Sequence, residues 1–161
     1  MNQESQKLSQ LLNQELQLSA NLLQFMLQEK ELLESNKHEE LQKITADKAY
    51  CLDQIEQTSR NRAQFLISVS SAASTVGRMK EFINKQHSPI RDSLQTSLDE
   101  LEKTLEQCRH QNSINGMVIS MSHRNVQRNL NILKGDDQDT MTYTQKGQTS
   151  TIGTRYGGLK V

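Results

Sequence analysis

The chain has no tryptophan, and aromatic residues make up only 4% of its 161 residues. Hydrophobic residues account for 34%, which is too little apolar side-chain volume for a thick globular core. There is a single proline, Pro89, and the composition is dominated by Leu, Gln, Glu, Ser and Lys, which favours helices over strands. These shortages predict thin helical packing.

Two cysteines, Cys51 and Cys108, are too few and too far apart for a disulfide framework or a metal site, so we expect a reducing compartment. No segment approaches the roughly 20 apolar residues that span a bilayer, and the N-terminus lacks the basic and apolar regions of a signal peptide. The four histidines show no metal-ligand spacing. We therefore expect a cytoplasmic protein with no cofactor, no metal and no direct membrane insertion.

The formal net charge is zero, which implies no bulk attraction to nucleic acid. The charge is nevertheless uneven along the chain. Residues 1–40 hold seven Glu against three Lys, whereas the segment from Cys108 to Gly135 contains Arg109, Arg124, Arg128 and Lys134 and no acid. No phosphate-binding loop, nucleophile signature or paired carboxylates are present, so we do not expect an enzyme.

Apolar residues recur at helical spacing from about residue 3 to residue 34, which predicts a first helix. A second helix is expected after Asn36, which could cap it together with Glu39. The Ser-rich stretch 67–77 predicts a break or bend, followed by one or two helical turns before residue 87. Ser88 as a cap and Pro89 at the first helical position then predict a helix of about 45 residues, which Gly135 ends.

The sequence therefore predicts an all-α fold, an elongated antiparallel bundle of three to four helices with a long C-terminal helix, over residues 1–134. Residues 135–161 are rich in Gly, Thr and Gln and have no periodicity. We expect them to form a disordered or extended tail, because they cannot bury enough apolar surface to offset the entropy cost of ordering.

Two asparagines interrupt the apolar stripe of the last helix. A polar residue in such a stripe needs hydrogen bonds, and one interpretation is that Asn112 and Asn115 fix the register by pairing with a neighbouring helix. Gly116 beside them costs roughly 1 kcal/mol relative to Ala, so it either permits close approach of another backbone or marks a bend. The stripe consists of Ile90, Leu94, Leu98, Leu101, Leu105, Cys108, Asn112, Asn115, Ile119, Ser122, Val126, Leu130 and Leu133.

A second apolar strip on the same helix consists of Ile114, Met117, Val118 and Met121. A helix in a thin bundle needs only one buried stripe. The functional hypothesis is that this second strip, with its adaptable Met side chains, docks a partner helix. The structural alternative is that a segment of the same chain, such as residues 76–83, covers it.

Several features together resemble the flagellar export chaperone FlgN family. They are the Leu-, Gln- and Glu-rich first helix, the segment 48–52, the block Asn112-x-x-Asn115-Gly116, Leu130 and Leu133 near the helix end, and the trailing Tyr143-x-x-x-Gly147. The resemblance covers nearly the whole chain. The Thr- and Gly-rich extension after Gly147 departs from the family pattern.

The resemblance implies a cytoplasmic type III secretion chaperone that binds the hook-filament junction proteins FlgK and FlgL and prevents their premature assembly. It also implies delivery of these proteins to the export gate, whose membrane component is FlhA. Arg124 and Arg128 would add charge steering, and Tyr143 is assigned to the export gate by family analogy. The expected apolar anchors for a junction protein are Ile114, Met117, Val118, Met121, Leu130 and Leu133.

A second hypothesis is a structural protein, that is, a helical subunit that is itself exported or self-assembles. The same apolar strip could pair with its own copy, so the sequence leaves this alternative open. An enzyme is the third and weakest hypothesis, because no polar residues converge in a recognisable catalytic pattern.

Overall fold

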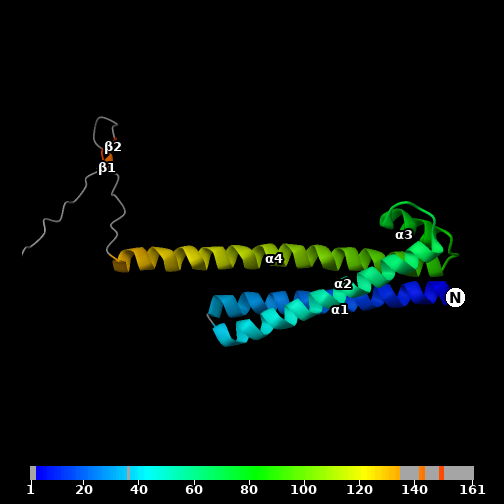
Figure 1. The fold of residues 1–161 in the computed structure, drawn as a ribbon, viewed down its shortest axis with the longest axis horizontal. Helices are drawn as coiled ribbons and strands as arrows, with labels where there is room; N and C mark the ends of the chain where they lie inside the picture. The colour runs from blue at the N-terminus through cyan, green and yellow to red at the C-terminus, as the bar shows by residue number, and fades with distance from the viewer. Residues whose placement is uncertain (1–2, 36, 135–141, 144–148, 151–161) are drawn as a thin grey trace, which may run out of the picture. The chain divides into compact units, whose positions relative to one another are not determined.

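In the computed structural model the described residues are 3–35, 37–134, 142–143 and 149–150. They form four helices, followed by a pair of two-residue strands with Thr142 opposite Ser150 and Tyr143 opposite Thr149 (Figure 1). The predicted all-α fold with a long C-terminal helix is confirmed. The elements are α1 (Gln3–Ser35), α2 (His38–Val69), α3 (Thr75–Asn84), α4 (Ile90–Lys134), β1 (Thr142–Tyr143) and β2 (Thr149–Ser150).

The chain divides into two units, Met1–Ile119 and Ser120–Val161. The predicted tail, residues 135–161, lies outside the described residues except for the two short strands. Its expected disorder therefore stays a prediction. No helix in the described ranges is both long enough and apolar enough to cross a membrane.

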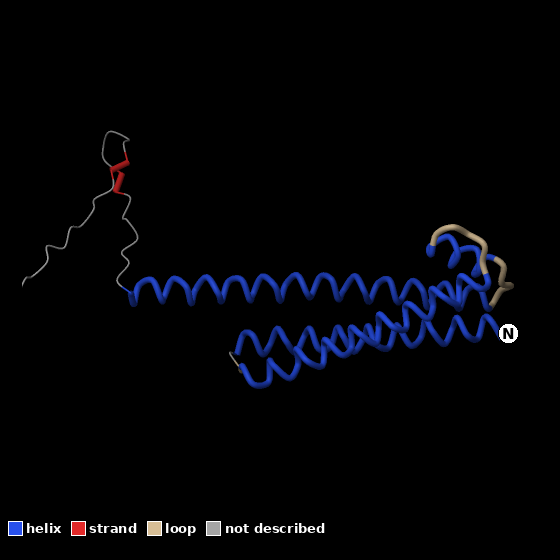
Figure 2. The backbone as a smooth tube through the Cα atoms, viewed as in Figure 1, coloured by secondary structure: helices blue, strands red, loops and turns tan. Residues whose placement is uncertain are grey.

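Helices α1 and α2 form an antiparallel hairpin (Figure 2). Two ion pairs join them, with Arg62 Nε 2.6 Å from Glu15 Oε1 and Lys48 Nζ 2.6 Å from Glu29 Oε2. Both glutamates are buried and lie three or four residues from buried apolar neighbours on α1. Buried carboxylates need such partners, so the pairs also fix which residues of the two helices face each other.

The part of α4 in the first unit runs parallel to α1. The Ser5 hydroxyl donates to Gln86 Oε1 at 2.7 Å just before α4, and the Cys108 thiol donates to the Ser19 carbonyl oxygen at 3.4 Å. Further along both helices, Asn115 Nδ2 donates to the Met26 carbonyl oxygen at 2.8 Å. Successive long helices therefore run in opposite directions, as the sequence predicts.

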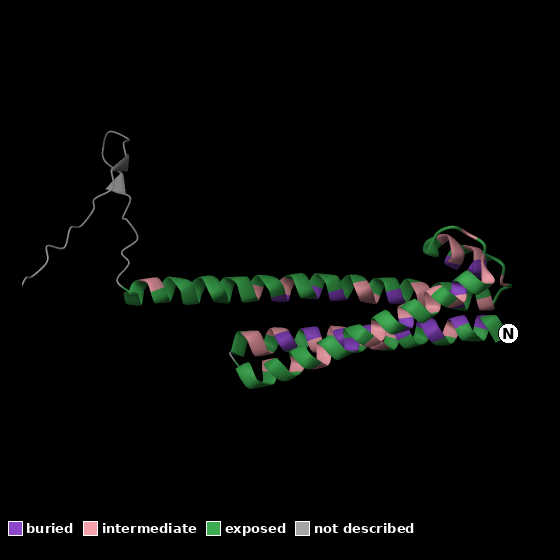
Figure 3. Ribbon diagram, viewed as in Figure 1, coloured by how far each residue is buried: buried purple, intermediate pink, exposed green. Residues whose placement is uncertain are grey.

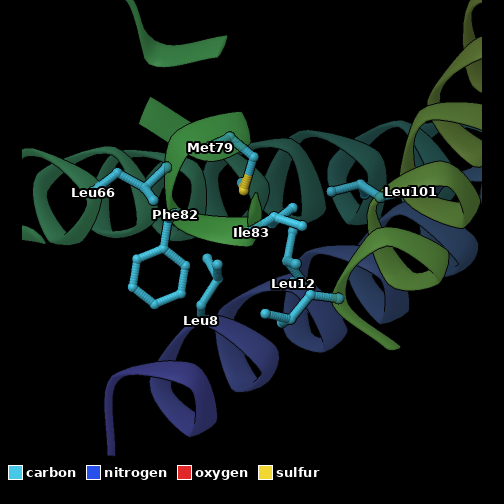
Figure 4. Close-up of a cluster of buried hydrophobic side chains, with 8 residues drawn as sticks. Leu8, Leu12, Leu66, Met79, Phe82, Ile83 and Leu101 are labelled. Atoms are coloured by element: carbon cyan, nitrogen blue, oxygen red, sulfur yellow. The ribbon is translucent and has the colours of Figure 1, made fainter. Parts of the chain in front are cut away.

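The larger hydrophobic core lies where α3 packs against the other three helices (Figure 4). Phe82 of α3 also makes an edge-to-face contact with Phe65 of α2, with ring centroids 5.9 Å apart. This arrangement buries Met79, Phe82 and Ile83 of α3 and so explains why a short ten-residue helix is stable here. The core residues are Leu8, Leu12, Leu66, Met79, Phe82, Ile83, Leu94 and Leu101.

A second hydrophobic cluster joins Leu22 and Met26 of α1, Cys51 of α2 and Cys108 of α4. Both cysteines are free and buried. Burial raises the pKa of each thiol, and the neighbouring Cys51 adds to the effect at Cys108. A raised pKa leaves little thiolate, so these cysteines act as small core side chains rather than as reactive groups.

The predicted break at residues 67–77 is confirmed but shorter, because α2 continues to Val69 and α3 begins at Thr75. The Ser74 hydroxyl accepts from the Gly77 N–H at 3.0 Å and caps α3. The same arrangement was predicted for Ser88 at the start of α4. There the Ser88 hydroxyl instead donates to Asp92 Oδ2 at 2.7 Å.

Helix α4 begins at Ile90, one residue later than predicted, so Pro89 precedes it and does not occupy its first position. The Ser88–Pro89 peptide bond is cis. At the start of α2 the capping position belongs to Lys37, whose side chain makes no cap hydrogen bond. Asn36, which the sequence analysis proposed as the cap, lies outside the described residues.

Candidate partner-binding surface

Asn115 is the last buried residue of α4, with 2% of its surface exposed. Its Nδ2 donates to the Met26 carbonyl oxygen at 2.8 Å and to Glu29 Oε2 at 2.7 Å, and its Oδ1 accepts from Gln111 Nε2 at 2.9 Å. Glu29 Oε2 also accepts from Lys48 Nζ at 2.6 Å. This polar cluster joins α1, α2 and α4, so the predicted pairing of a stripe asparagine with a neighbouring helix is confirmed for Asn115.

The other asparagine of the predicted stripe, Asn112, is exposed, so its placement in the stripe was wrong. Steps of three and four residues lead from Cys108 to Asn115 through either Gln111 or Asn112. The structure buries Gln111, whose side-chain amide donates to Asn115. Helical spacing alone could not separate these two neighbouring positions.

Gly116 lies in the middle of α4, which continues through it to Lys134. A Cβ atom built on Gly116 meets no heavy atom within 4 Å. The predicted close approach of another backbone is therefore not observed among the described residues.

In the first unit, the second apolar strip is partly exposed. Ile114 and Val118 are half-buried, whereas 57% of Met117 is exposed. Ile119, which was predicted to lie in the buried stripe, is 48% exposed. Burial on α4 thus stops at Asn115, although the apolar pattern of its sequence continues.

In the second unit, every residue from Ser120 to Leu130 is exposed, and Figure 3 shows this part of α4 in the colour of exposed residues. Met121 is 57% exposed, Leu130 43% and Leu133 82%. Arg124 and Arg128 are also exposed, and no acid accompanies them on this part of the helix. All the predicted anchors of this unit are therefore accessible on the helix surface.

Two further exposed apolar residues were missed or misplaced by the sequence analysis. Ile132 is 69% exposed and follows Met121 and Arg128 at helical spacing, so it extends the second strip. Val126, which was assigned to the buried stripe, is 55% exposed and shares a face with Leu130 and Leu133. The helical spacing that identified the second strip could have found Ile132 as well.

The structural alternative for the second strip was that residues 76–83 cover it. Instead, Met79, Phe82 and Ile83 of α3 pack with the cluster that contains Leu94 and Leu101, near the start of α4. This alternative is wrong for the described residues.

Two grooves in the first unit were not predicted. The α3 groove, of about 260 Å³, has Val76 and Met79 on one side and Leu98 and Leu105 on the other. The hairpin groove, of about 430 Å³, lies between the end of α1 and the start of α2, and Phe25, Leu32 and Ile44 are among its lining residues. The excess of Glu in residues 1–40 was the one sequence signal that pointed to the hairpin groove.

Tyr143 belongs to β1, where it pairs with Thr149. Its side chain and Gly147 lie outside the described part of the chain, so the assignment to an export gate stays a prediction. Among the described residues, no group of three or more His, Cys, Asp or Glu could hold a metal ion.

A family model described as FlgN protein matches residues 1–151, which include all four helices and both strands. No curated protein and no solved structure matches the chain. The family match spans the polar cluster at Asn115 and the exposed part of α4 alike, and the chain therefore belongs to the FlgN family of flagellar export chaperones.

Proposed function

We propose that the protein works in the cytoplasm as the export chaperone of the hook-filament junction proteins FlgK and FlgL. In this role it binds each junction protein, prevents premature assembly and delivers the protein to the export gate through FlhA. Family membership supports a chaperone role in flagellar export. A chaperone needs a surface that captures a partner rather than a reaction centre.

The observation that carries this proposal is the row of exposed apolar side chains on α4. Large apolar side chains that remain exposed along one helix are typical of protein interaction sites. Met117 and Met121 are each 57% exposed, and methionine adapts to irregular apolar partners. An amphipathic helix of the junction protein would pack on this row in a coiled-coil-like manner. The proposed anchors are Ile114, Met117, Val118, Met121, Leu130 and Leu133.

Arg124 and Arg128 would contribute mainly to the rate and orientation of binding. Both are exposed, and exposed charges add little to affinity but accelerate encounter with a partner of opposite charge. An acidic flank on the bound segment of the junction protein would fit this arrangement.

The test replaces Met117 and Met121 together with Asp. We expect Met117→Asp/Met121→Asp to abolish co-purification with a C-terminal fragment of FlgK, because two carboxylates would have to be desolvated in the interface. Helicity should be unchanged, since both side chains are already exposed. The measurement is a pull-down combined with circular dichroism.

The matched control is Leu27→Asp/Ile67→Asp, which alters two exposed apolar residues on α1 and α2 that are 46% and 59% exposed. This control should bind the FlgK fragment like the wild type. Undiminished capture by the Met117→Asp/Met121→Asp variant would refute α4 as the binding surface.

A separate prediction concerns Tyr143. If Tyr143 contacts the export gate, Tyr143→Ala should retain FlgK binding but lose binding to the cytoplasmic part of FlhA, because the two contacts involve different parts of the chain. Calorimetric titrations of the variant with each partner measure this. Equal loss of both partners would argue against a separate gate contact.

A further inference from the structure

The hairpin groove has an apolar floor, a volume of about 430 Å³ and no side chain of α3 or α4 in its lining. Phe25 and Leu32 come from α1 and Ile44 from α2, and all three are only half-buried. Their remaining exposed surface is apolar area that a partner could cover.

The rim of this groove is acidic. Glu31, Glu40 and Asp47 line it together with a single base, Lys43. Glu40 lies 3.5 Å from Lys37, in a pair whose side chains are both more than half exposed. Within the described part of the chain, Glu31 and Asp47 have no ion-pair partner, so the groove presents uncompensated negative charge.

The same chain carries a surface of opposite character. The exposed second half of α4 has Met121 and Ile132 on one face, with Arg124 and Arg128 beside them and no acid from residue 120 to residue 134. Its apolar and basic groups match the apolar floor and acidic rim of the hairpin groove.

We propose that the hairpin groove binds the second half of α4 from another copy of this chain. In the proposed dimer each copy supplies its helix to the groove of the other, so that the two contacts are equivalent and the assembly is closed. Met121 and Ile132 pack on Phe25 and Ile44, and Arg124 and Arg128 face the acidic rim. The proposed dimer does not rest on the identity of the export substrate, because both of its surfaces belong to this chain.

A second copy can cover both the hairpin groove and the second half of α4, which favours it over an unrelated partner. The groove of the first unit is lined by residues of α1 and α2 alone, and residues 120–130 of the second unit are exposed. The charges also disfavour other pairings of two copies. Two grooves facing each other would bring acidic groups together, and two α4 helices facing each other would bring basic groups together.

The test uses the full chain and two charge-reversed variants. The helix variant is Arg124→Glu/Arg128→Glu, and the groove variant is Glu31→Lys/Asp47→Lys. Among the described residues none of these four side chains has an ion-pair partner, so neither variant breaks an ion pair of the monomer. Light scattering coupled to gel filtration, over a concentration series, gives the molar mass and the dimer dissociation constant.

We expect the wild type to dimerise and each variant alone to dissociate about ten-fold or more readily, because each homodimer would face like charges. A mixture of the two variants should restore the dimer as a heterodimer, since its two contacts then both pair opposite charges. A chain carrying all four changes should restore the homodimer. Added salt should weaken the wild-type dimer.

The control Asp53→Lys/Glu100→Lys changes the net charge as much as the groove variant does, at exposed positions outside both surfaces, and should dimerise like the wild type. Three results would overturn the proposal: a monomer at all concentrations, growth beyond a dimer, or no heterodimer in the mixture. Should the groove variant fail to fold by circular dichroism, the exposed single change Glu31→Lys replaces it.

Discussion

At the scale of single residues, Asn115 shows how hydrogen bonds can offset the cost of burying a polar side chain. Its amide satisfies the Met26 carbonyl oxygen and one oxygen of Glu29, which also accepts from Lys48. Without Asn115 the Glu29–Lys48 pair would lose a neutral hydrogen-bond donor in a site where the Glu29 side chain is only 8% exposed. Such losses are costly because the remaining groups stay desolvated.

We therefore predict that Asn115→Ala lowers the free energy of unfolding by about 1–3 kcal/mol. The matched control is Asn112→Ala, three residues earlier on the same helix, which is exposed and should change the stability by less than about 0.5 kcal/mol. Urea denaturation followed by circular dichroism measures both variants. Equal effects at the two positions would contradict the assignment of the polar cluster.

At the scale of elements, the helix positions were predictable because the spacing of apolar residues and the residues that end helices indicate the same boundaries. The first helix was expected over about residues 3–34 and is observed at Gln3–Ser35, and the last was expected to end before Gly135 and ends at Lys134. Helix caps were less predictable. Ser74 caps α3 through a hydroxyl that accepts a backbone N–H, whereas Ser88 donates to Asp92. A serine hydroxyl can donate and accept hydrogen bonds, so the residue type alone does not predict whether it caps a helix.

The binding surface was predictable in part. Sequence periodicity identified Met117 and Met121 because they lie off the main stripe, and the structure leaves both exposed. It could not show that burial stops at Asn115, because Ile119 and Val126 continue the stripe in the sequence. The residue at which the stripe loses its partner helix depends on the lengths and packing of the other helices. The sequence pattern of α4 alone holds no information about them.

The connection between α2 and α3 leads to a prediction about pH. Glu81 accepts hydrogen bonds from Lys85 Nζ at 2.6 Å, from the Ser70 hydroxyl, and from the Ala72 N–H at 3.1 Å. The Lys85 and Ser70 hydrogen bonds, with smaller help from Ala72, lower the pKa of Glu81 from 4.5 to about 2. A lowered pKa in the folded state stabilises the fold above about pH 4.5, and this contribution disappears as the pH falls towards about 2.

We predict that Glu81→Gln destabilises the protein at neutral pH and that the difference from the wild type shrinks as the pH falls from about 4.5 to about 2. The glutamine keeps the shape of the side chain but loses the charge that holds Lys85 and the Ser70 hydroxyl. Denaturant unfolding of both proteins at several pH values measures the difference. A constant difference over that range would show that the Glu81 charge does not stabilise the connection.

At the scale of the whole molecule, the two proposals share one surface. Met121, Arg124 and Arg128 are assigned both to the junction protein and to the groove of a second copy, and one helix face cannot hold two partners at once. Binding of a junction protein and dimerisation must then be mutually exclusive, which by linkage means that each lowers the apparent affinity of the other. A dimer would keep Met121 and Ile132 of α4 covered until a junction protein replaces the second copy.

We therefore predict that a C-terminal fragment of FlgK converts the dimer into a complex with one chaperone chain and one fragment. The apparent affinity for the fragment should fall as the chaperone concentration rises above the dimer dissociation constant, because more of the chaperone is then self-associated. The helix variant Arg124→Glu/Arg128→Glu should show this concentration dependence only at chaperone concentrations about ten-fold or more higher, since its dimer dissociates that much more readily. Light scattering on titrated mixtures measures the stoichiometry. A stable complex of two chaperone chains with two fragments would show that the second copy and the junction protein bind different faces of α4.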